Sequence, residues 1–263
     1  MASENWSMEL AKERTIRDRL VERGQAFFDR PAQPIKYTHA PAADALLNDF
    51  DSHPHAFLLA CVMDRQIKAE KAWIIPYRIS EKLGTFSMGH LAQLSVKEVQ
   101  RLLSKPVPLH RFPEVMGTNF HSAVQRIAKQ YSGDASRIWI GRPPSAEVIY
   151  RFLEFDGVGP KIATMATNLL ARNHKIPFSD YYSIDISADV HVRRVFGRLG
   201  LCPANASIEQ IIYKARALHP TFPGILDLSS WQIGRTYCGD RAPKCDDCYL
   251  NDLCPTALQR QYV

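Results

Sequence analysis

The sequence lacks any apolar run long enough to span a lipid bilayer. Its longest apolar stretches, such as residues 57–63, are far shorter than the ~20 residues of a membrane-spanning helix. The first residues also lack a basic segment followed by an apolar core, so we find no secretory signal. We therefore expect no membrane partner, and a location in the cytoplasm or, in a nucleated cell, in the nucleus.

Patterns typical of β-strands are scarce, and the sequence has no internal repeat and no low-complexity tract. Apolar residues recur instead at the spacing of one buried face of an α-helix, which predicts an all-α fold. The polar and aromatic residues 173–185 are expected to form a loop. Helices are expected at residues 8–28, 42–50, 54–64, 65–83, 95–103, 121–131, 146–154, 189–199, 207–217 and 224–235, with another starting at Pro160.

The chain carries a modest excess of positive charge. Lysine and arginine number 33 against 27 aspartates and glutamates, which gives a formal charge of +6. This balance suits a polyanionic partner such as nucleic acid, although many basic proteins merely have a solvated basic face. The charge is not confined to a tail, so the fold must assemble any nucleic-acid surface.

Four of the six cysteines are concentrated near the C-terminus. Cys61 lies in an apolar run and Cys202 stands alone, so we expect both to be small core residues. Without a secretion signal, a metal or cluster site is a better interpretation of the other four than disulfides. Four thiolates can bind either tetrahedral zinc or an iron–sulfur cubane, and ligand chemistry alone does not choose between them. The spacing is Cys238-x6-Cys245-x2-Cys248-x5-Cys254.

A glycine turn separates two predicted helices in the middle of the chain. Ser145 is expected to cap the first helix, and the turn Gly157-Val158-Gly159 precedes Pro160, a residue favoured in the first helical turn. Unsatisfied amides at the start of the second helix can grip a phosphate, which positions DNA without reading its bases. The alternative is a simple turn between helices. Lys161 follows, where the positive end of the helix dipole favours a neutral amine.

Three segments together resemble the endonuclease III branch of the helix–hairpin–helix DNA glycosylases. They are the cysteine spacing with the Gly-Arg-Thr-Tyr before it, the hairpin with Lys161, and residues 187–195. The resemblance covers about residues 57–254. It implies a [4Fe–4S] cluster on the four cysteines, with zinc as the alternative.

The resemblance also implies two helical domains that flank a DNA-binding cleft. One is a six-helix barrel that carries the hairpin, and the other holds the iron–sulfur cluster. The expected boundaries are residues 1–52 for an N-terminal extension that packs partly with the cluster domain, 53–172 for the barrel with the hairpin at 146–171, and 173–263 for the C-terminal domain with the cluster loop at 238–254.

The catalytic pair implied by the resemblance is Lys161 and Asp189. Lys161 would attack the sugar C1′, and Asp189 would stabilise the oxocarbenium character of the sugar and accept a proton from the lysine. The alternatives are that Lys161 only contacts phosphate and that Asp189 caps the following helix, a role compatible with catalysis. Asp185 is the rival carboxylate, but the Asp-x-His-x-x-Arg context favours Asp189.

The resemblance further implies DNA contacts and a base pocket. Gln66 matches the glutamine that fills the gap left by a flipped base, and Tyr181, Tyr182 and Asp185 could line the pocket for that base. The sequence departs from the family after Gln66, where a Thr-Asp pair is absent, and at residues 116–119, where a large apolar wedge is absent. The expected DNA contacts are Gly157, Val158, Gly159, Gln66, Arg194, Arg241 and Lys244.

These features predict a bifunctional DNA glycosylase that flips and excises a damaged base from double-stranded DNA. It would then cleave the strand by β-elimination. The substrate implied by the resemblance is an oxidised pyrimidine, and we expect a monomer. The alternatives are a monofunctional glycosylase for another damaged or modified base and a non-catalytic iron–sulfur DNA-binding protein.

Overall fold

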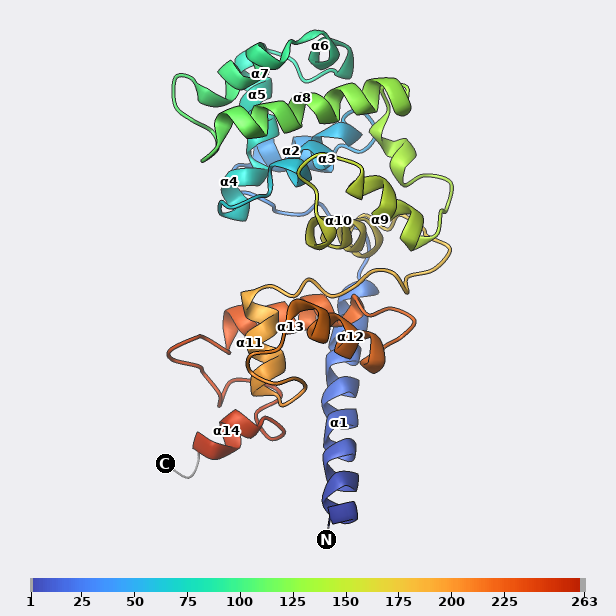
Figure 1. The fold of residues 1–263 in the computed structure, drawn as a ribbon, viewed down its shortest axis with the longest axis vertical. Helices are drawn as coiled ribbons and strands as arrows, with labels where there is room; N and C mark the ends of the chain where they lie inside the picture. Colours follow the sequence, from blue (N-terminus) through green and yellow to red (C-terminus); the bar gives the residue numbers. More distant parts are fainter. Residues whose placement is uncertain (1, 261–263) are drawn as a thin grey trace. The chain divides into compact units, whose positions relative to one another are not determined.

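The computed structural model describes residues 2–260, with side chains from residue 7 onward, and over this range it contains helices and no strand, as predicted (Figure 1). Within the same range, none of the helices combines the length and apolar character needed to cross a membrane. The elements are α1 (Ala2–Phe28), α2 (Pro41–Asn48), α3 (Pro54–Met63), α4 (Ala69–Trp73), α5 (Ile75–Leu83), α6 (Met88–Gln93), α7 (Val96–Ser104), α8 (Pro113–Gln130), the 3-10 helix η1 (Ala135–Ile138), α9 (Ser145–Leu153), α10 (Pro160–Arg172), α11 (Val190–Arg198), α12 (Ile208–Leu218), α13 (Ile225–Thr236) and α14 (Pro255–Arg260).

The chain forms two compact units. Unit 1 combines residues 1–31 with residues 180–263, and unit 2 consists of residues 32–179. Helix α1 therefore belongs with the C-terminal helices, although it begins the chain.

Unit 2 is built around α3, which is buried along its whole length. Helix α8 packs on α3 and on α7, and α9 packs on α10. Aromatic side chains fill the space beside α3, where Phe57 lies 5.7 Å from Trp73 and 6.1 Å from Trp139 between ring centroids. A helix that is apolar on all sides, as α3 is, forms the centre of a core.

The prediction of one helix over residues 65–83 is wrong. The chain leaves the helical conformation after Met63, and residues 64–68 form a loop before α4 and α5. Gln66 has a φ of 54°, which no right-handed helix accommodates. Apolar spacing continues on both sides of this loop, so periodicity alone missed the break.

Two predicted helix starts also need correction. Helix α8 begins at Pro113 rather than at residue 121, with the proline in its first turn. Helix α9 begins at Ser145 itself, and Pro144 holds the capping position, so Ser145 is not the cap. Asp189 does cap α11 as expected, because its Oδ1 accepts the backbone N–H groups of His191 and Val192, each at 2.9 Å.

Unit 1 is centred on α13, against which both α1 and α11 pack. Ile16, Leu20 and Phe27 are the buried face of α1. Two charged contacts join α1 to the segment before α14 and to α12. Arg19 donates to both carboxylate oxygens of Asp252, at 2.7 and 2.8 Å, and Lys214 pairs with Glu13 at 2.7 Å.

Candidate functional site

The glycine turn between α9 and α10 requires glycine at its first position. Gly157 has a φ of +91°, a conformation that L side chains rarely adopt, and a Cβ there would lie 2.7 Å from Nδ2 of Asn119. Gly159 is the N-cap of α10, and a Cβ added there would meet nothing within 4 Å. The backbone at the start of α10 is therefore open on that side, and no side chain caps it within the described chain.

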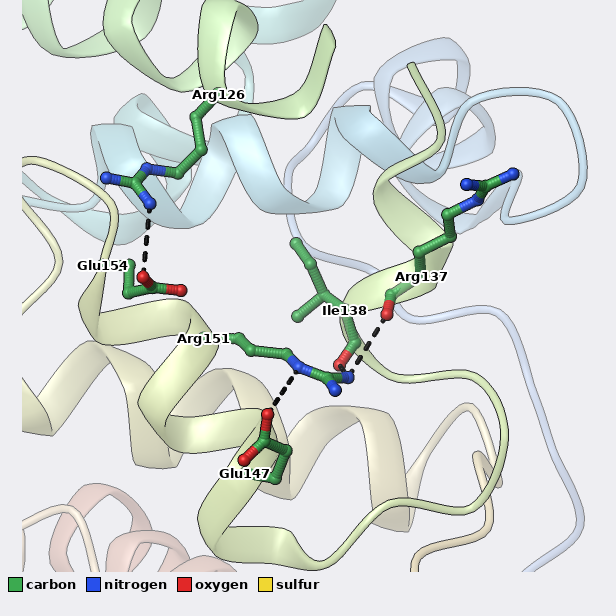
Figure 2. A network of polar contacts seen from close by, with 6 residues as sticks. All are labelled: Arg126, Arg137, Ile138, Glu147, Arg151 and Glu154. Carbon is green, nitrogen blue, oxygen red and sulfur yellow. Dashed lines mark hydrogen bonds and ion pairs between the residues drawn. The ribbon is translucent and has the colours of Figure 1, made fainter. Parts of the chain in front are cut away.

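A polar network holds α9 in place ahead of the turn (Figure 2). Arg151 pairs through Nε with Glu147 at 3.0 Å, and its Nη1 donates to the carbonyl of Ile138 at 2.9 Å and to that of Arg137 at 3.3 Å. Arg126 of α8 donates to Glu154 at the end of α9, at 3.4 Å. The hairpin is thus tied to η1 and to α8. Sequence reasoning missed this network, because its carbonyl acceptors carry no signal in the sequence.

One pocket of unit 2 brings together three of the predicted features: the hairpin, Gln66 and Lys161. The loop Asp64–Ile67 forms one wall, and residues 157–162 with Met165 form the other. Lys161 is the second residue of α10, and its side chain is exposed. Gln66 is also exposed, and its positive φ directs the chain out of the helical path. Strained residues of this kind often mark functional sites.

Asp64 is the single acidic residue that lines this pocket among the described residues, and sequence reasoning did not identify it. Burial raises the pKa of its carboxyl, while a hydrogen bond from Nε1 of Trp73 at 3.3 Å and the charge of Lys161 act in the opposite direction. The loop is also held from its other side, because Nε2 of the buried His110 contacts the carbonyl oxygen of Arg65 at 3.0 Å. The sequence signal that could have identified Asp64 is its position as an acidic residue directly after the buried helix α3.

The three residues predicted to line a base pocket, Tyr181, Tyr182 and Asp185, lie in unit 1. Asp185 accepts two hydrogen bonds from Arg216, at 2.7 and 2.8 Å, and this contact raises the pKa of the guanidinium. Tyr181 packs against Phe222 with ring centroids 5.0 Å apart, and Tyr182 is exposed. A base pocket formed by these residues stays a prediction. So does the convergence of Asp189, which lies in unit 1, and Lys161, which lies in unit 2, on one sugar.

The four clustered cysteines line a single pocket of unit 1 whose other walls come from α11, α13 and α14. Burial raises the pKa of the Cys248 thiol, and the nearby thiols of Cys254, Cys238 and Cys245 add to that effect. In residues 2–260, no three His, Cys, Asp or Glu side chains converge closely enough to hold one metal ion.

Two arginines of α11 connect that helix to the cysteine segment. Arg198 donates through Nη1 to Sγ of Cys238 at 3.4 Å, and its carbonyl accepts from the thiol of Cys254 at 3.3 Å. Arg194 donates to the carbonyls of Cys238 at 2.6 Å and Gly234 at 2.9 Å. Arg194 thus supports the start of the segment, and its predicted DNA contact stays a prediction.

The remaining predicted DNA contacts of unit 1, Arg241 and Lys244, are both exposed. Exposed acidic side chains at Asp246 and Asp247 follow them closely, so the segment presents both signs of charge. Away from this segment, Cys61 is fully buried as expected, and Cys202 is only partly buried.

The sequence matches no protein-family profile and no curated protein. The fold matches solved structures. A trapped covalent intermediate of endonuclease III with DNA has 20% identity and a TM-score of 0.57, over 83% of this chain and 95% of that one. A non-covalent endonuclease III–DNA complex has 19% identity and a TM-score of 0.62, over 96% and 99%. A thermostable thymine-DNA glycosylase has 14% identity and a TM-score of 0.61, over 92% and 97%. At these identities the likeness shows the fold, which is the all-helical fold of endonuclease III.

Proposed function

We propose that this chain, which has the fold of endonuclease III, is a DNA glycosylase that removes a damaged base from double-stranded DNA and cleaves the strand at the exposed sugar. One observation carries the proposal: the open backbone of the glycine turn, Gln66 and Lys161 line the same pocket. A phosphate gripped by the turn would hold the nucleotide next to the only lysine of that pocket in the described chain.

In this reaction the Lys161 amine forms a bond to the sugar C1′ while the base leaves with the electrons of the glycosidic bond. The C1′–O4′ bond then opens, with O4′ taking a proton, to give an imine that acidifies the C2′ proton. Loss of that proton expels the 3′ phosphate and cleaves the strand on the 3′ side by β-elimination. Asp189 would supply the negative charge that stabilises the oxocarbenium character of the sugar. Two backbone N–H groups fix its Oδ1, which suits a charge that must be preorganised rather than mobile.

We propose that the four clustered cysteines hold a [4Fe–4S] cluster rather than zinc, as the resemblance in their spacing implies. A cubane takes one thiolate at each of its irons, so its ligands are spread around a larger centre than those of one tetrahedral ion. The four thiols of unit 1 line one pocket, so one group could take all four of them as ligands. When bound, the cluster would supply a crosslink for the segment rather than bond chemistry.

Borohydride trapping on duplexes that carry damaged bases tests the function. We expect the wild-type protein to release an oxidised pyrimidine and to form a covalent adduct. Lys161→Ala should abolish the adduct, whereas Lys129→Ala, which removes an exposed lysine of α8, should retain it. Asp189→Asn should slow base release by roughly a hundredfold or more.

A second candidate function keeps base release and omits strand cleavage. The exposure of the Lys161 side chain favours it, because an exposed lysine beside the open start of α10 can contact a phosphate without attacking the sugar. In that case no adduct would be trapped, and strand breaks would require heat or alkali. Absence of base release from any damaged duplex would contradict both functions.

A further inference from the structure

A second carboxyl group, Asp64, shares the pocket of Lys161. Asp64 follows the last residue of α3, and its backbone N–H bonds to the carbonyl of Cys61 at 3.1 Å. Lys161 belongs to the first turn of α10 and lines the same pocket, and its charge favours the ionised form of Asp64. The two residues are almost one hundred positions apart in the sequence, and only the packing of unit 2 brings them to one site.

The surroundings of Asp64 are those of a proton acceptor. It lies at the C-terminal end of a helix, where the dipole disfavours a negative charge, and burial raises the pKa of its carboxyl. A carboxylate in such a place is a stronger base than one in water. The Nε1 hydrogen bond from Trp73 holds Oδ2 at 3.3 Å, so the carboxyl has a fixed orientation.

Asp189 has the opposite environment. Its Oδ1 accepts two backbone hydrogen bonds at the N-terminal end of α11, where the helix dipole favours a negative charge. Two carboxyls with contrasting surroundings are commonly divided between two tasks, one as a fixed charge and the other as a group that exchanges a proton.

We propose that Asp64 is a positioning residue for Lys161. The carboxylate of Asp64 accepts the proton that leaves the Lys161 ammonium as the nitrogen bonds to the sugar C1′. This inference rests on the proposed function. In the step, an N–H bond of Lys161 breaks and an O–H bond forms on Asp64. The N–C1′ bond forms, and the base leaves C1′ with the electron pair of the glycosidic bond. No oxidant or reductant takes part.

The other charged and titratable groups around Asp64 set the test conditions. Glu70, which follows the loop, disfavours the charge on Asp64, and Lys161 favours it. His110 holds the loop through the carbonyl of Arg65, and burial lowers the pKa of its imidazole, so it carries no charge at neutral pH. Lys161 is therefore the cation to which Asp64 responds.

The experiment measures the single-turnover rate of borohydride trapping on a duplex with an abasic site, across a range of pH. An abasic substrate removes any dependence on the identity of the damaged base. For the wild type, we expect trapping to decline in acid at a pH above the ordinary carboxyl range. For Asp64→Asn, we expect a rate roughly a hundredfold lower at neutral pH, with the deficit shrinking at high pH because solvent then deprotonates Lys161. Asp64→Glu should restore part of the rate.

Two controls separate this role from a structural one. Asn at position 64 can still accept the Trp73 hydrogen bond, so binding to a duplex with a tetrahydrofuran abasic analogue should not change. Glu70→Gln removes the neighbouring carboxylate that disfavours the charge on Asp64, so it should move the acid limit slightly downward and leave the rate at neutral pH unaltered. If Asp64→Asn fails to fold, the wild-type acid limit still decides, because a limit in the ordinary carboxyl range contradicts the inference.

Each failure has a distinct result. If Asp64→Asn traps as fast as the wild type, or faster at neutral pH, the carboxylate only stabilises the ammonium, and the inference is overturned while the proposed function stands. If the wild type releases a base but traps nothing, strand cleavage and this inference both fall. If the wild type neither releases a base nor traps, the proposed function itself fails.

Discussion

The hairpin of unit 2, residues 146–171, and the cysteine segment of unit 1, residues 238–254, obtain their shape in different ways. The hairpin buries Phe155 and Val158, and Arg126 and Arg151 tie it to neighbouring elements. Between residues 238 and 254, only Leu250 is fully buried, and helix is absent from this described segment. The comparison indicates that packing and backbone conformation specify the hairpin, whereas the cysteine segment relies on arginine contacts from α11 and, under the proposed function, on the group its thiols would bind.

The largest effect should therefore come from removing one thiol. We predict that Cys248→Ser loses the cluster and lowers the free energy of unfolding of unit 1 by about 5 kcal/mol or more, because binding of a structural metal centre is coupled to folding. Cys202→Ser, which changes a partly buried cysteine outside the pocket, is the matched control.

Iron and sulfide content, with thermal unfolding, measure this effect. The wild type should contain about four irons per chain, and the Cys202 variant should retain them. Hydrogen exchange should remain slow in the hairpin of the Cys248 variant. A stable, iron-free wild-type protein would contradict the assigned difference between the two regions.

Acid should have the next largest effect and should act on unit 2. Burial lowers the pKa of His55 and of His174 from 6.5 to about 4 in the folded protein. The unfolded chain therefore binds more protons as pH falls from 6.5 towards 4, and stability that is fully present above 6.5 is lost across that range. Between pH 7 and pH 5 the loss should be roughly 2 kcal/mol for each histidine.

Denaturant unfolding followed by fluorescence of the buried Trp73 and Trp139 at both pH values measures this loss. His55→Phe should reduce the difference between the two pH values by about half. An equal unfolding free energy at pH 7 and pH 5 would show that the two imidazoles keep ordinary proton affinities in the folded state.

The sequence predicted those parts of the molecule that depend on local patterns. Helices α11, α12 and α13 lie within a residue or two of their predicted bounds, because their apolar faces recur at helical spacing. The Asp189 cap was predictable for the same reason, since a capping carboxylate bonds only to the next few amides.

Features that depend on distant segments could not be predicted. In the loop at residues 64–68 the backbone leaves the helical conformation at Asp64, takes a positive φ at Gln66 and is extended at Lys68. The burial of Asp64 is set by the packing of α3 against α4 and by the pocket shared with α10. A sequence does not distinguish a partly buried carboxyl from an exposed one, so the role of Asp64 could be inferred only from the structure.

Within the hairpin, the two glycines should differ in what they contribute. We predict that Gly157→Ala lowers the free energy of unfolding by about 2 kcal/mol, because alanine is strained at a φ of +91° and its Cβ would press on Asn119. Gly159→Ala should leave stability within about 0.5 kcal/mol, since its Cβ meets nothing within 4 Å.

For Gly159→Ala, DNA binding should respond differently from stability. Its methyl group would occupy the open side of the backbone where a phosphate is proposed to bind, so affinity for duplex DNA should fall although stability does not. Urea unfolding and fluorescence anisotropy measure the two quantities. Unchanged affinity in Gly159→Ala would place the phosphate grip elsewhere.

The smallest predicted effect concerns the network around α9. We ask whether it contributes more to the stability of the hairpin than an ordinary surface ion pair does. Arg151→Met removes the donor to the carbonyls of Ile138 and Arg137, and we predict a loss of about 1 kcal/mol. Arg78→Met removes an exposed pair with Glu81 on one helix and should leave the free energy of unfolding almost unchanged. Urea unfolding compares the two variants. If they lose the same amount, interhelical hydrogen bonds do not hold the hairpin, and Gly157 with the buried side chains must suffice.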